Sequence, residues 1–524
     1  MRWLRRREIA AAVCVTLLCL AVRIWFARKV NFCGTPDSCY ALGLAQSLAS
    51  YHAFHAWFLF DLQVSHPHIP NTGLEYWRPG VSLILYLFRS VGGTTLHGSL
   101  VITALAGALW AAAAWFVAMR ATGNARIALA SYTLCLVLPP GWESSLTPDP
   151  TLFYAAAIAW FLALFTVRRQ GLAQDIVALF CVSAAYMIRN DAGLLLVPLL
   201  VVLVYRWRGS QAARVRGEAP TRGSSVGYCV AIVTGFLLAL VPMHLVYQHV
   251  LGTAFPPGAS KALYLNDLSD FNSYGSPVNM HTMLSRGIGH LLAMRIGAVA
   301  TIVYRVLALV LGYTALVFLP ALGTRNDAHR NEIALPELAG PVSFGAAILL
   351  VYSIVLPAVG VFSALRSSTG LLPVASVLVV VAILRIARTR RLALALTLTA
   401  VSIYVVSGVM DDRRTVDPLN AIGATDRAEA EALAAMGARP NSGAIVMTPD
   451  PVQFSVTTGY PAIPMPGNGS DAITNEALDL HASYAILDGD QRAAVRKSLH
   501  PAGSATILAQ PVILLKLPSE PKQR

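Results

Sequence analysis

The chain has 524 residues, of which 56% are hydrophobic and only 13% are charged. That charged fraction is about half of what an ordinary soluble protein carries, so the composition excludes a soluble domain and indicates a protein that crosses a membrane many times. The net charge of +13 would suit a protein that binds nucleic acid. The arginines, however, form short clusters between apolar runs and no extended basic face, and this pattern fits the topology of a membrane protein better.

The amino-terminal segment has four arginines ahead of an apolar run that begins at Ile9 and continues to about Ala27. A cleaved signal peptide needs a small-x-small site after the run, and none follows here, so we predict an uncleaved first span. Because positive residues stay on the cytoplasmic side, the amino terminus is expected to be cytoplasmic.

Further apolar stretches bring the predicted number of transmembrane helices to about eleven, several of them shorter than the roughly 20 residues of a straight span. They cover residues 100–119, 127–138, 151–167, 172–188, 192–205, 226–250, 306–323, 342–362, 370–384 and 392–410. Their connections alternate in arginine content, as the positive-inside rule requires. An odd number of spans therefore puts the chain beyond residue 410 on the side opposite to the amino terminus.

The outer side receives a long first loop over residues 28–99. Within it, residues 37–50 and 51–62 mix aromatic and polar side chains and are predicted to be helices that lie on the membrane surface. Residues 79–91 are apolar but too short to span, and residues 281–304 of a later outer loop are amphipathic. We expect these segments to roof a cavity at the outer face.

The chain beyond residue 410 is polar enough to be soluble and alternates helical and strand signals. The predicted elements are a helix over residues 424–439 and strands over residues 443–447, 461–465, 484–488 and 505–517. The predicted fold class is therefore an all-α polytopic membrane domain over residues 1–410 with a small extracytoplasmic α/β domain over residues 411–524. The sequence contains neither a P-loop nor a G-x-G-x-x-G motif, so nothing indicates nucleotide binding.

Two carboxylates on the outer side are the candidate catalytic residues. Asp37 lies in the polar turn TPDSC after the first span, and Asp149 precedes a later span in the sequence TPDPT. Either Thr35 or Asp37 also suits the N-cap of the helix that follows, which is the plainer interpretation of this turn. The two acids form one site only if their helices pack together.

Outer-face basic residues are the second candidate feature, because the positive-inside rule predicts few of them. Arg78 and Arg366 lie close to predicted membrane boundaries, where a lipid phosphate needs forked donors, so phosphate binding is favoured over simple snorkelling. Arg189 and Lys261 are further candidates for donor phosphate binding. Arg189 also has Asp191 as an obvious structural partner.

Cysteine and histidine residues give weaker signals. Cys33 and Cys39 flank Asp37 in a polar loop, where either a disulfide or two free thiols would fit; the other five of the seven cysteines lie within apolar segments. His66 and His68 would suit a metal or a solvated loop, and the loop is preferred because two histidines are too few for a site. No cysteine or histidine spacing predicts zinc.

Four features occur along the chain in a fixed order: an acid in a long first outer loop (Asp37), an Arg-Pro step before the next apolar helix (Arg78), a second acid in the next outer loop (Asp149), and the stretch YMIRNDAG at residues 186–193. This combination resembles the GT-C superfamily of integral-membrane glycosyltransferases. Within it, the chain looks most like bacterial relatives of protein O-mannosyltransferases and aminoarabinose transferases, of the glycosyltransferase family thirty-nine type. Parts of the polar carboxy-terminal region, residues 447–451, 458–466 and 484–488, resemble the outer domain of such proteins.

The resemblance implies an enzyme of the bacterial inner membrane that transfers a sugar from a polyprenyl-phosphate or pyrophosphate donor to a lipid, glycan or protein acceptor on the outer face. It implies that Asp37 acts on the acceptor, that Asp149 is the second acid and that Arg78 contacts the donor phosphate, although the chain has Arg-Pro-Gly where many relatives have a basic residue followed by Pro-Pro. Three further side chains are expected to line the substrate site: Glu75, Tyr76 and His66. Members differ in metal dependence, so no cofactor is assigned and a divalent metal stays open.

A transporter or flippase of a lipid-linked glycan is the main alternative, since it would also use arginines and membrane acids. Such a protein should have ionisable residues near the bilayer midplane and broken helices in paired halves. Here the charges gather at one face and no half of the chain repeats the other. A mere anchor for the outer domain would not need so many spans.

Overall fold

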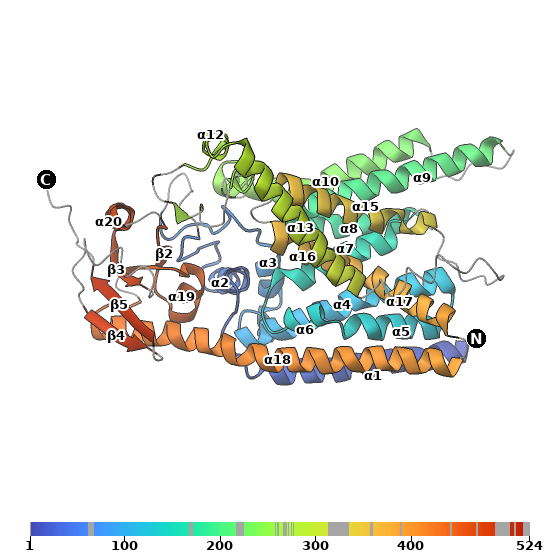
Figure 1. The fold of residues 1–524 in the computed structure, drawn as a ribbon, viewed down its shortest axis with the longest axis horizontal. Coiled ribbons are helices and arrows are strands. Elements are labelled where there is room, and N and C mark those ends of the chain that lie inside the picture. Colours follow the sequence, from blue (N-terminus) through green and yellow to red (C-terminus); the bar gives the residue numbers. More distant parts are fainter. Residues whose placement is uncertain are drawn as a thin grey trace.

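The computed structural model of the chain describes residues 2–60, 68–166, 171–215, 225–256, 258, 261–265, 270, 272–273, 275, 277–312, 335–356, 360–387, 390–440, 443–467, 470–487, 503–507 and 510–516. Long helices run side by side as a bundle, and a small sheet lies beyond one end of it (Figure 1). The amino terminus lies at the opposite end of the bundle.

The bundle contains the following apolar helices: α1 (Arg2–Ala27), α4 (Leu96–Thr122), α5 (Ala125–Leu136), α7 (Pro150–Leu164), α8 (Leu172–Ile188), α9 (Leu196–Val215), α10 (Val226–Leu251), α13 (Ile288–Gly312), α15 (Ala339–Leu350), α17 (Leu372–Ile386) and α18 (Arg390–Ala435). In the described part of the chain, six helical stretches are long and apolar enough to cross a membrane, and five shorter apolar helices accompany them. The predicted polytopic all-α domain is therefore confirmed, and six of its described helices reach the length of a span.

Capping residues explain where the long helices begin and end. α4 starts after Thr95, whose hydroxyl accepts the N–H of Gly98, and it stops at Gly123, which adopts a left-handed φ of 64°. Ser225 and Gly252 bound α10 in the same way. Because α10 has 26 residues, its length of about 39 Å is enough to cross a hydrocarbon core of roughly 30 Å.

Burial divides the bundle helices into a lipid-facing side and a packed side. Large apolar side chains such as Leu18 and Phe180 are well exposed, as expected of residues that face lipid. The buried faces of α4 and α7 are rich in alanine, for example Ala114 and Ala155, which lets these two helices approach each other closely.

The predicted span over residues 342–362 is not one continuous helix. α15 ends at Leu350 and continues as a π-helical turn, η5 (Val351–Val355), and a separate helix, α16 (Gly360–Ser368), follows. Hydropathy alone does not reveal this break, because the residues on both sides of it are apolar. The break matters for function, since α16 carries Arg366.

The outer segment predicted over residues 281–304 is also built differently. It is divided between α12 (Met280–Ser285) and α13, and the division falls at Gly287, which has a left-handed φ of 87°. No helix-stopping residue separates residue 304 from residue 306, so α13 runs on to Gly312 and into the predicted span over residues 306–323. Residues 313–323 of that span lie outside the described residues.

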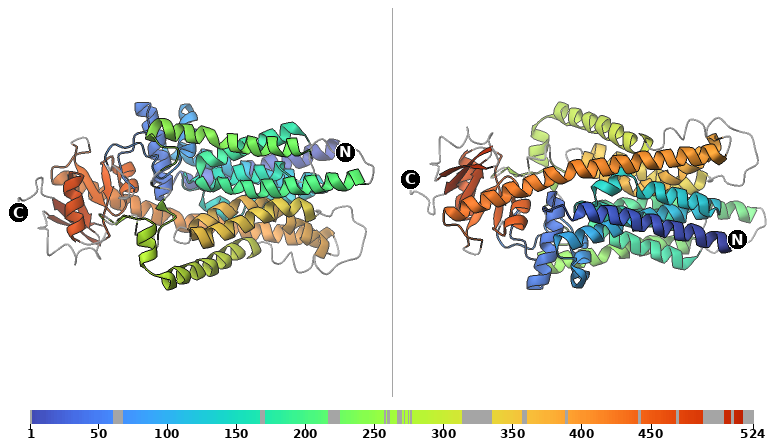
Figure 2. Two further views of the ribbon diagram at one scale, coloured as in Figure 1. Left: turned by 90° about the horizontal axis from the view of Figure 1, so that it is seen from above. Right: turned by 90° about the horizontal axis from the view of Figure 1, so that it is seen from below.

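Helix α2 (Pro36–Tyr51) lies across the end of the bundle, between the bundle and the sheet (Figures 1 and 2). The second surface helix, predicted over residues 51–62, is wrong for the described part of that segment. Ala56 instead pairs with Asn71, and Phe58 forms a parallel bridge with Ala462. The edge of the carboxy-terminal sheet has free backbone N–H and C=O groups, and this segment pairs with them in an extended conformation instead of forming a helix.

The carboxy-terminal region contains a five-stranded sheet in the order β2-β1-β3-β5-β4. Its strands are β1 (Ile445–Thr448), β2 (Ala462–Pro464), β3 (Ala482–Leu487), β4 (Gly503–Ile507) and β5 (Gln510–Lys516). β1 pairs in parallel with β2 and β3, whereas β5 pairs antiparallel with β3 and β4. Helices α19 (Pro451–Thr458) and α20 (Ser470–Asp479) complete the predicted α/β region, and the predicted strand over residues 505–517 is divided between β4 and β5.

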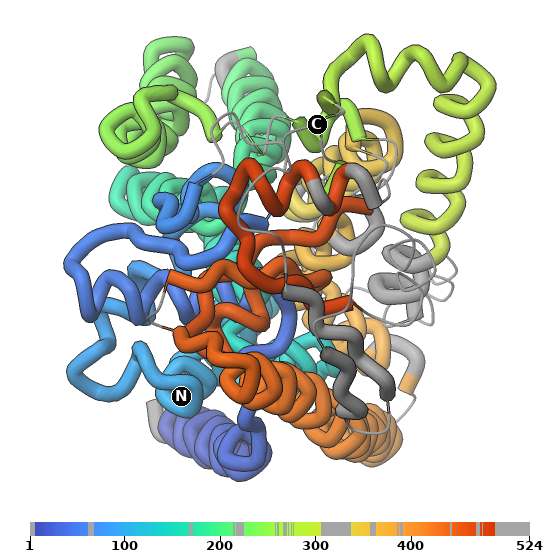
Figure 3. The backbone as a smooth tube through the Cα atoms, turned by 90° about the vertical axis from the view of Figure 1, so that its left-hand side faces the viewer, coloured from blue at the N-terminus to red at the C-terminus, as the bar shows by residue number. Residues whose placement is uncertain are grey.

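The long helix α18 connects the bundle to the sheet, and Figure 3 shows the carboxy-terminal region lying over the end of the bundle. With 46 residues, α18 continues through residue 410, where the domain boundary is predicted. Alanine, glutamate and arginine are good helix formers, so the polar second half of α18 remains helical after the apolar half ends.

The first outer loop and the carboxy-terminal region are packed against each other. Leu59 lies in one buried cluster with Met447 and Ile463. Gly43 of α2 lies so close to Val456 of α19 that an added Cβ would come within 2.6 Å of a valine methyl group. The space between these two regions is therefore bounded by packed elements on both sides.

Candidate active site

The starts of two helices position the two candidate carboxylates. Thr35 caps α2 by accepting the N–H of Ser38 at 3.3 Å, which leaves Asp37, in the first turn, for other contacts. Asp149 is the N-cap of α7, where its Oδ1 accepts the N–H of Thr151 at 2.7 Å. The N-cap of α2 in the TPDSC turn is therefore Thr35 and not Asp37.

Arg366 joins the two carboxylates. Its Nη1 forms an ion pair with Asp37 Oδ2, and its Nη2 forms a second one with Asp149 Oδ2 at 3.2 Å. Asp149 is largely buried, whereas the Asp37 and Arg366 side chains are 18% and 26% exposed. One guanidinium group therefore holds two acids from separate outer loops in one partly open site.

Further contacts fix these carboxylates. Trp77 Nε1 donates to Asp37 Oδ1 at 2.6 Å, and its ring packs on Tyr40 with the centroids 4.7 Å apart. The Thr35 hydroxyl donates to Asp149 Oδ2 at 3.4 Å. Asp37 is thus held from one side by an indole N–H and from the other by a guanidinium.

A second ion pair supports the helix that carries Arg366. Arg189 pairs with Asp191 at 3.0 Å, and the other oxygen of Asp191 accepts the hydroxyls of Tyr352 and Ser367. Ser367 is the next residue after Arg366, so this buried pair anchors α16 to the 3-10 turn η2 (Asn190–Leu195), which precedes α9. The structure agrees with Asp191 as the structural partner of Arg189.

Arg78 is buried and is oriented by uncharged groups. Its Nε donates to Asn190 Oδ1 and its Nη1 to the carbonyl of Tyr186 at 2.7 Å, while the guanidinium lies 3.7 Å from the centre of the Tyr186 ring. Among the ion pairs between described residues, none joins Arg78 to an acid. Arg78 directly follows Trp77, which donates to Asp37, so one residue along the chain separates the buried guanidinium from a contact of the carboxylate pair.

Of the other predicted site residues that the structure describes, Glu75, Tyr76 and Lys261 form no hydrogen bond or ion pair with Asp37 or Asp149. Glu75 and Tyr76 line a small pocket together with Trp77, and the Glu75 carbonyl accepts the N–H of Gly258 at 3.0 Å. That bond brings the outer loop that holds Lys261 up to the Arg78 segment. His66 lies outside the described residues.

A disulfide joins Cys33, in the turn before α2, to Cys39, within the first turns of α2, and the two Cα atoms lie 4.9 Å apart. Gly34 lies within this turn at a left-handed φ of 97°, where a Cβ would come within 2.3 Å of Thr147. Thr147 belongs to the outer loop that also holds Asp149. The close approach therefore requires glycine and brings the two acid-bearing loops together.

A separate cavity lies away from the carboxylate pair. It has a volume of about 620 Å³ and lies between α2 and the carboxy-terminal region, and Asp37, Asp149 and Arg366 do not line it. The opposed charges converge instead at the carboxylate pair. Within the described residues, no group of three or more His, Cys, Asp or Glu side chains is arranged to hold a metal ion.

Several residues of the site do not stand out in the sequence. Trp77 is visible there only as part of the segment that precedes Arg78, and nothing local indicates that it donates to Asp37. Nothing in the sequence indicates Tyr352 or Ser367, because their role is to donate hydrogen bonds to Asp191, which is distant in the sequence. Asn190 lies inside the stretch YMIRNDAG, which is its one available signal.

Comparison with known proteins gives matches to one family model and to solved structures. Residues 66–216 match the family model described as dolichyl-phosphate-mannose-protein mannosyltransferase, whereas no curated protein matches the chain. The structure of ArnT from Cupriavidus metallidurans bound to undecaprenyl phosphate has a TM-score of 0.59 at 14% identity and covers 98% of this chain and 99% of that chain. The apo state of the same protein has a TM-score of 0.59 at 13% identity, with 97% and 98% covered. The chain therefore has the GT-C fold, and fold and family match together indicate a membrane glycosyltransferase of this type.

Proposed function

We propose that the chain transfers a sugar from a polyprenyl-phosphate or pyrophosphate carrier to an acceptor at the extracytoplasmic face of the bacterial inner membrane. The observation that carries the proposal is the shared Arg366, which brings Asp37 and Asp149 into one site. Undecaprenyl phosphate, which is bound in the ArnT structure, is the carrier type that we extend to this chain.

In this reaction, an acceptor hydroxyl oxygen attacks the anomeric carbon while the bond from that carbon to the phosphate oxygen breaks. The bonding electrons leave with the phosphate as the polyprenyl phosphate anion, and the acceptor proton passes to the Asp37 carboxylate. A carboxylate in that position supplies general base catalysis. Direct displacement inverts the anomeric centre, by analogy with glycosidases that use no covalent intermediate.

The basic residues have two different roles in this proposal. Arg78 is the main ligand of the donor phosphate, because it is buried, stacked on Tyr186 and oriented by Asn190 without an acid partner among the described ion pairs. Arg366 fixes the two carboxylates and has further N–H donors for the leaving phosphate. Arg189 supports α16 through Asp191, and Lys261 lies in the outer loop that reaches Glu75.

The same arrangement supports the proposed sidedness. The amino terminus, the end of α9 and the start of α10 lie at one end of the bundle, whereas α2 and the sheet lie at the other (Figure 1). The arginine-rich end is cytoplasmic by the positive-inside rule, so Asp37 and the domain over residues 411–524 are extracytoplasmic.

The Asp37→Asn variant tests the proposed function. The full-length protein in detergent is assayed with hexose- and pentose-linked polyprenyl phosphates and an envelope extract as acceptor, and undecaprenyl phosphate binding is measured separately. We expect transfer to fall by roughly 10² or more, because the base is lost, while undecaprenyl phosphate still binds. Asp417→Asn, the same change on an exposed stretch of α18, should retain full transfer.

Two outcomes would contradict the proposal. Full transfer by Asp37→Asn would remove this carboxylate from the chemistry. Movement of a lipid-linked glycan across proteoliposomes, without transfer by the wild-type protein, would support the transporter instead.

A further inference from the structure

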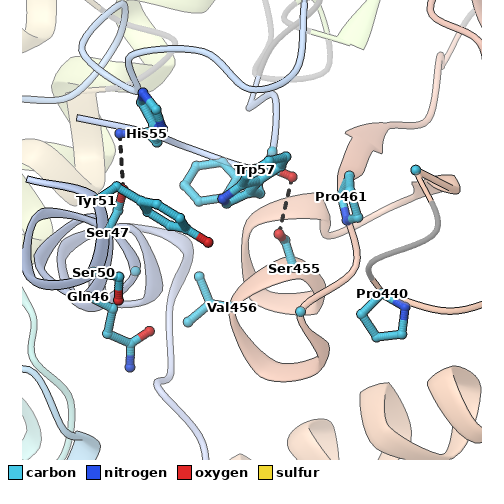
Figure 4. A pocket seen from close by; sticks show the side chains of 14 residues that line it. Gln46, Ser47, Ser50, Tyr51, His55, Trp57, Pro440, Ser455, Val456 and Pro461 are labelled. Carbon is cyan, nitrogen blue, oxygen red and sulfur yellow. Dashed lines mark hydrogen bonds between the residues drawn. The ribbon is translucent and has the colours of Figure 1, made fainter. Parts of the chain in front are cut away.

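The cavity of about 620 Å³ lies on the outer side of the molecule and has two walls from distant parts of the chain. One wall is the second half of α2 with the segment after it, and the other is α19 with the turns that flank it. Figure 4 shows Tyr51, His55 and Trp57 on the first wall and Ser455, Val456 and Pro461 on the second. The volume falls within the range of about 300–1,000 Å³ that is typical of small-ligand sites.

The lining is neutral. None of the 14 described residues that line the cavity is an aspartate, glutamate, lysine or arginine. A phosphate, a nucleic acid or a charged peptide would find no counter-charge here. The lining instead combines aromatic rings with hydroxyl and amide groups.

Two large aromatic rings in the lining remain accessible. Tyr51 is 55% exposed and Trp57 is 39% exposed, and their ring centroids lie 6.4 Å apart. His55 stacks on Tyr51 with the centroids 5.7 Å apart. Flat rings of this kind pack on the C–H faces of sugar rings, while their polar ends stay available for hydrogen bonds.

Polar groups in the lining divide into those that hold the cavity together and those left for a ligand. Ser47 accepts the N–H of His55 at 3.1 Å, and Ser455 donates to the Trp57 carbonyl at 3.2 Å. Gln46 donates through its amide nitrogen to the Thr94 carbonyl, which leaves its amide oxygen. The described part of the chain supplies no hydrogen-bond partner for the hydroxyls of Ser50 and Tyr51.

The cavity is preformed. The Trp57 carbonyl also accepts the N–H of Ala462 at 2.9 Å, so the aromatic segment is bonded to the edge of the sheet. Close contact of Gly43 with Val456 holds α2 against α19. A rigid site loses less conformational entropy when it binds a ligand.

From these observations we propose that this cavity is an acceptor subsite for a neutral oligosaccharide, an inference that rests on the proposed glycosyl transfer. Helix α2 carries Asp37 in its first turn and Tyr51 at its end, about 21 Å further along the axis. The cavity thus holds sugar units of the acceptor that are remote from the reacting hydroxyl. Its occupation sets the affinity for the acceptor and not the rate of the chemical step.

Calorimetric titration of the full-length protein tests this subsite. The probes are hexasaccharides of glucose, mannose and N-acetylglucosamine, with a serine- and threonine-rich peptide titrated in parallel. We expect at least one hexasaccharide to bind, and Tyr51→Ala and Trp57→Ala each to weaken its binding about tenfold, which corresponds to about 1.4 kcal/mol, because each change removes an aromatic ring on which a sugar ring packs. Ser50→Arg, which introduces a charged side chain at an exposed position, should abolish binding without disturbing the fold.

Controls separate this inference from the proposed function. Phe88→Ala removes an exposed aromatic ring that does not line the cavity, and Asp37→Asn removes the base, so both should bind the sugar as the wild type does. If no hexasaccharide binds, if the Tyr51, Trp57 and Ser50 variants leave binding unchanged, or if only the peptide binds, the subsite is refuted while the transferase proposal stands. A transferase failure with intact sugar binding would refute only the proposed function.

Discussion

Arg366 holds one guanidinium group between two carboxylates, and this is the feature of the site that depends most on the exact side chain. A planar fork contacts Asp37 with one nitrogen and Asp149 with the other. A lysine ammonium is a point charge that cannot reproduce both contacts in their present geometry. The two acids would then repel each other without a shared partner.

The Arg366→Lys variant is therefore expected to lose sugar transfer by roughly 10² in kcat, a loss typical of removing one preorganised donor from an active site. Steady-state kinetics of the purified protein would measure it. Arg286→Lys is the matched control, since Arg286 forms an exposed pair with Asp270 at 3.1 Å. An Arg366→Lys enzyme with wild-type kcat would show that the bridge is dispensable.

The sequence predicts which residues are candidates for the site but not which side chains they contact. Asp37 and Asp149 can be identified because each is an acid on the outer side of a sided protein, which is a local property. Arg366 is expected from the sequence to bind phosphate, and its contacts with both acids are not predicted. That contact depends on how α16 packs against α2 and α7, and the break after α15 that creates α16 has no marker in the hydropathy.

At the level of single elements, helix α20 contains a buried acid with no role in the proposed chemistry. Glu476 is fully buried, and in the described structure neither of its carboxylate oxygens has a hydrogen-bond partner. It lies among Ile473 and Ala477, which pack against the sheet. Burial raises the pKa of Glu476 to about 9 from the usual 4.5.

This pKa shift predicts how the stability of the carboxy-terminal region depends on pH. Between pH 4.5 and about 9, the folded state keeps the Glu476 proton and the unfolded state does not, so stability falls as the pH rises through this window. Glu476→Gln, which is neutral throughout, should lose most of that slope and gain about 1–3 kcal/mol at the alkaline end, with little change near pH 4.

Protease resistance of residues 411–524 within the full-length protein is the suitable measurement, because this region need not unfold together with the bundle. Glu431→Gln is the control, since that carboxylate is exposed on α18. A Glu476→Gln protein with the same pH profile as the wild type would mean that the carboxyl is not protonated in the folded state.

For the whole molecule, hydropathy and arginine placement predict the helical bundle and the separate α/β region because both signals act locally along the chain. The same signals put the end of the last span at residue 410, where α18 in fact continues, since a change from apolar to polar composition is not a helix stop. No local sequence signal indicates that residues 56–59 dock onto the sheet edge. Their partner Ala462 lies some 400 residues away in the sequence, and Ser455, which donates to the Trp57 carbonyl, is separated from Trp57 by 398 residues.

Every functional proposal made for this molecule requires that α2, the Asp149 loop and the carboxy-terminal region lie on one side of the membrane. Two exposed positions test this: Ser50→Cys at the end of α2 and Arg126→Cys at the start of α5, where the side chain is 72% exposed. In intact cells, a membrane-impermeant maleimide should label Ser50→Cys, whereas Arg126→Cys should react only after permeabilisation, because the arginine-rich connections stay inside. The wild-type chain, whose five free cysteines lie within apolar helices, gives the background labelling. Labelling of Arg126→Cys alone in intact cells would invert the assigned sidedness and remove Asp37 from the face at which the acceptor is expected. Labelling of both variants would contradict their placement on opposite sides of the membrane.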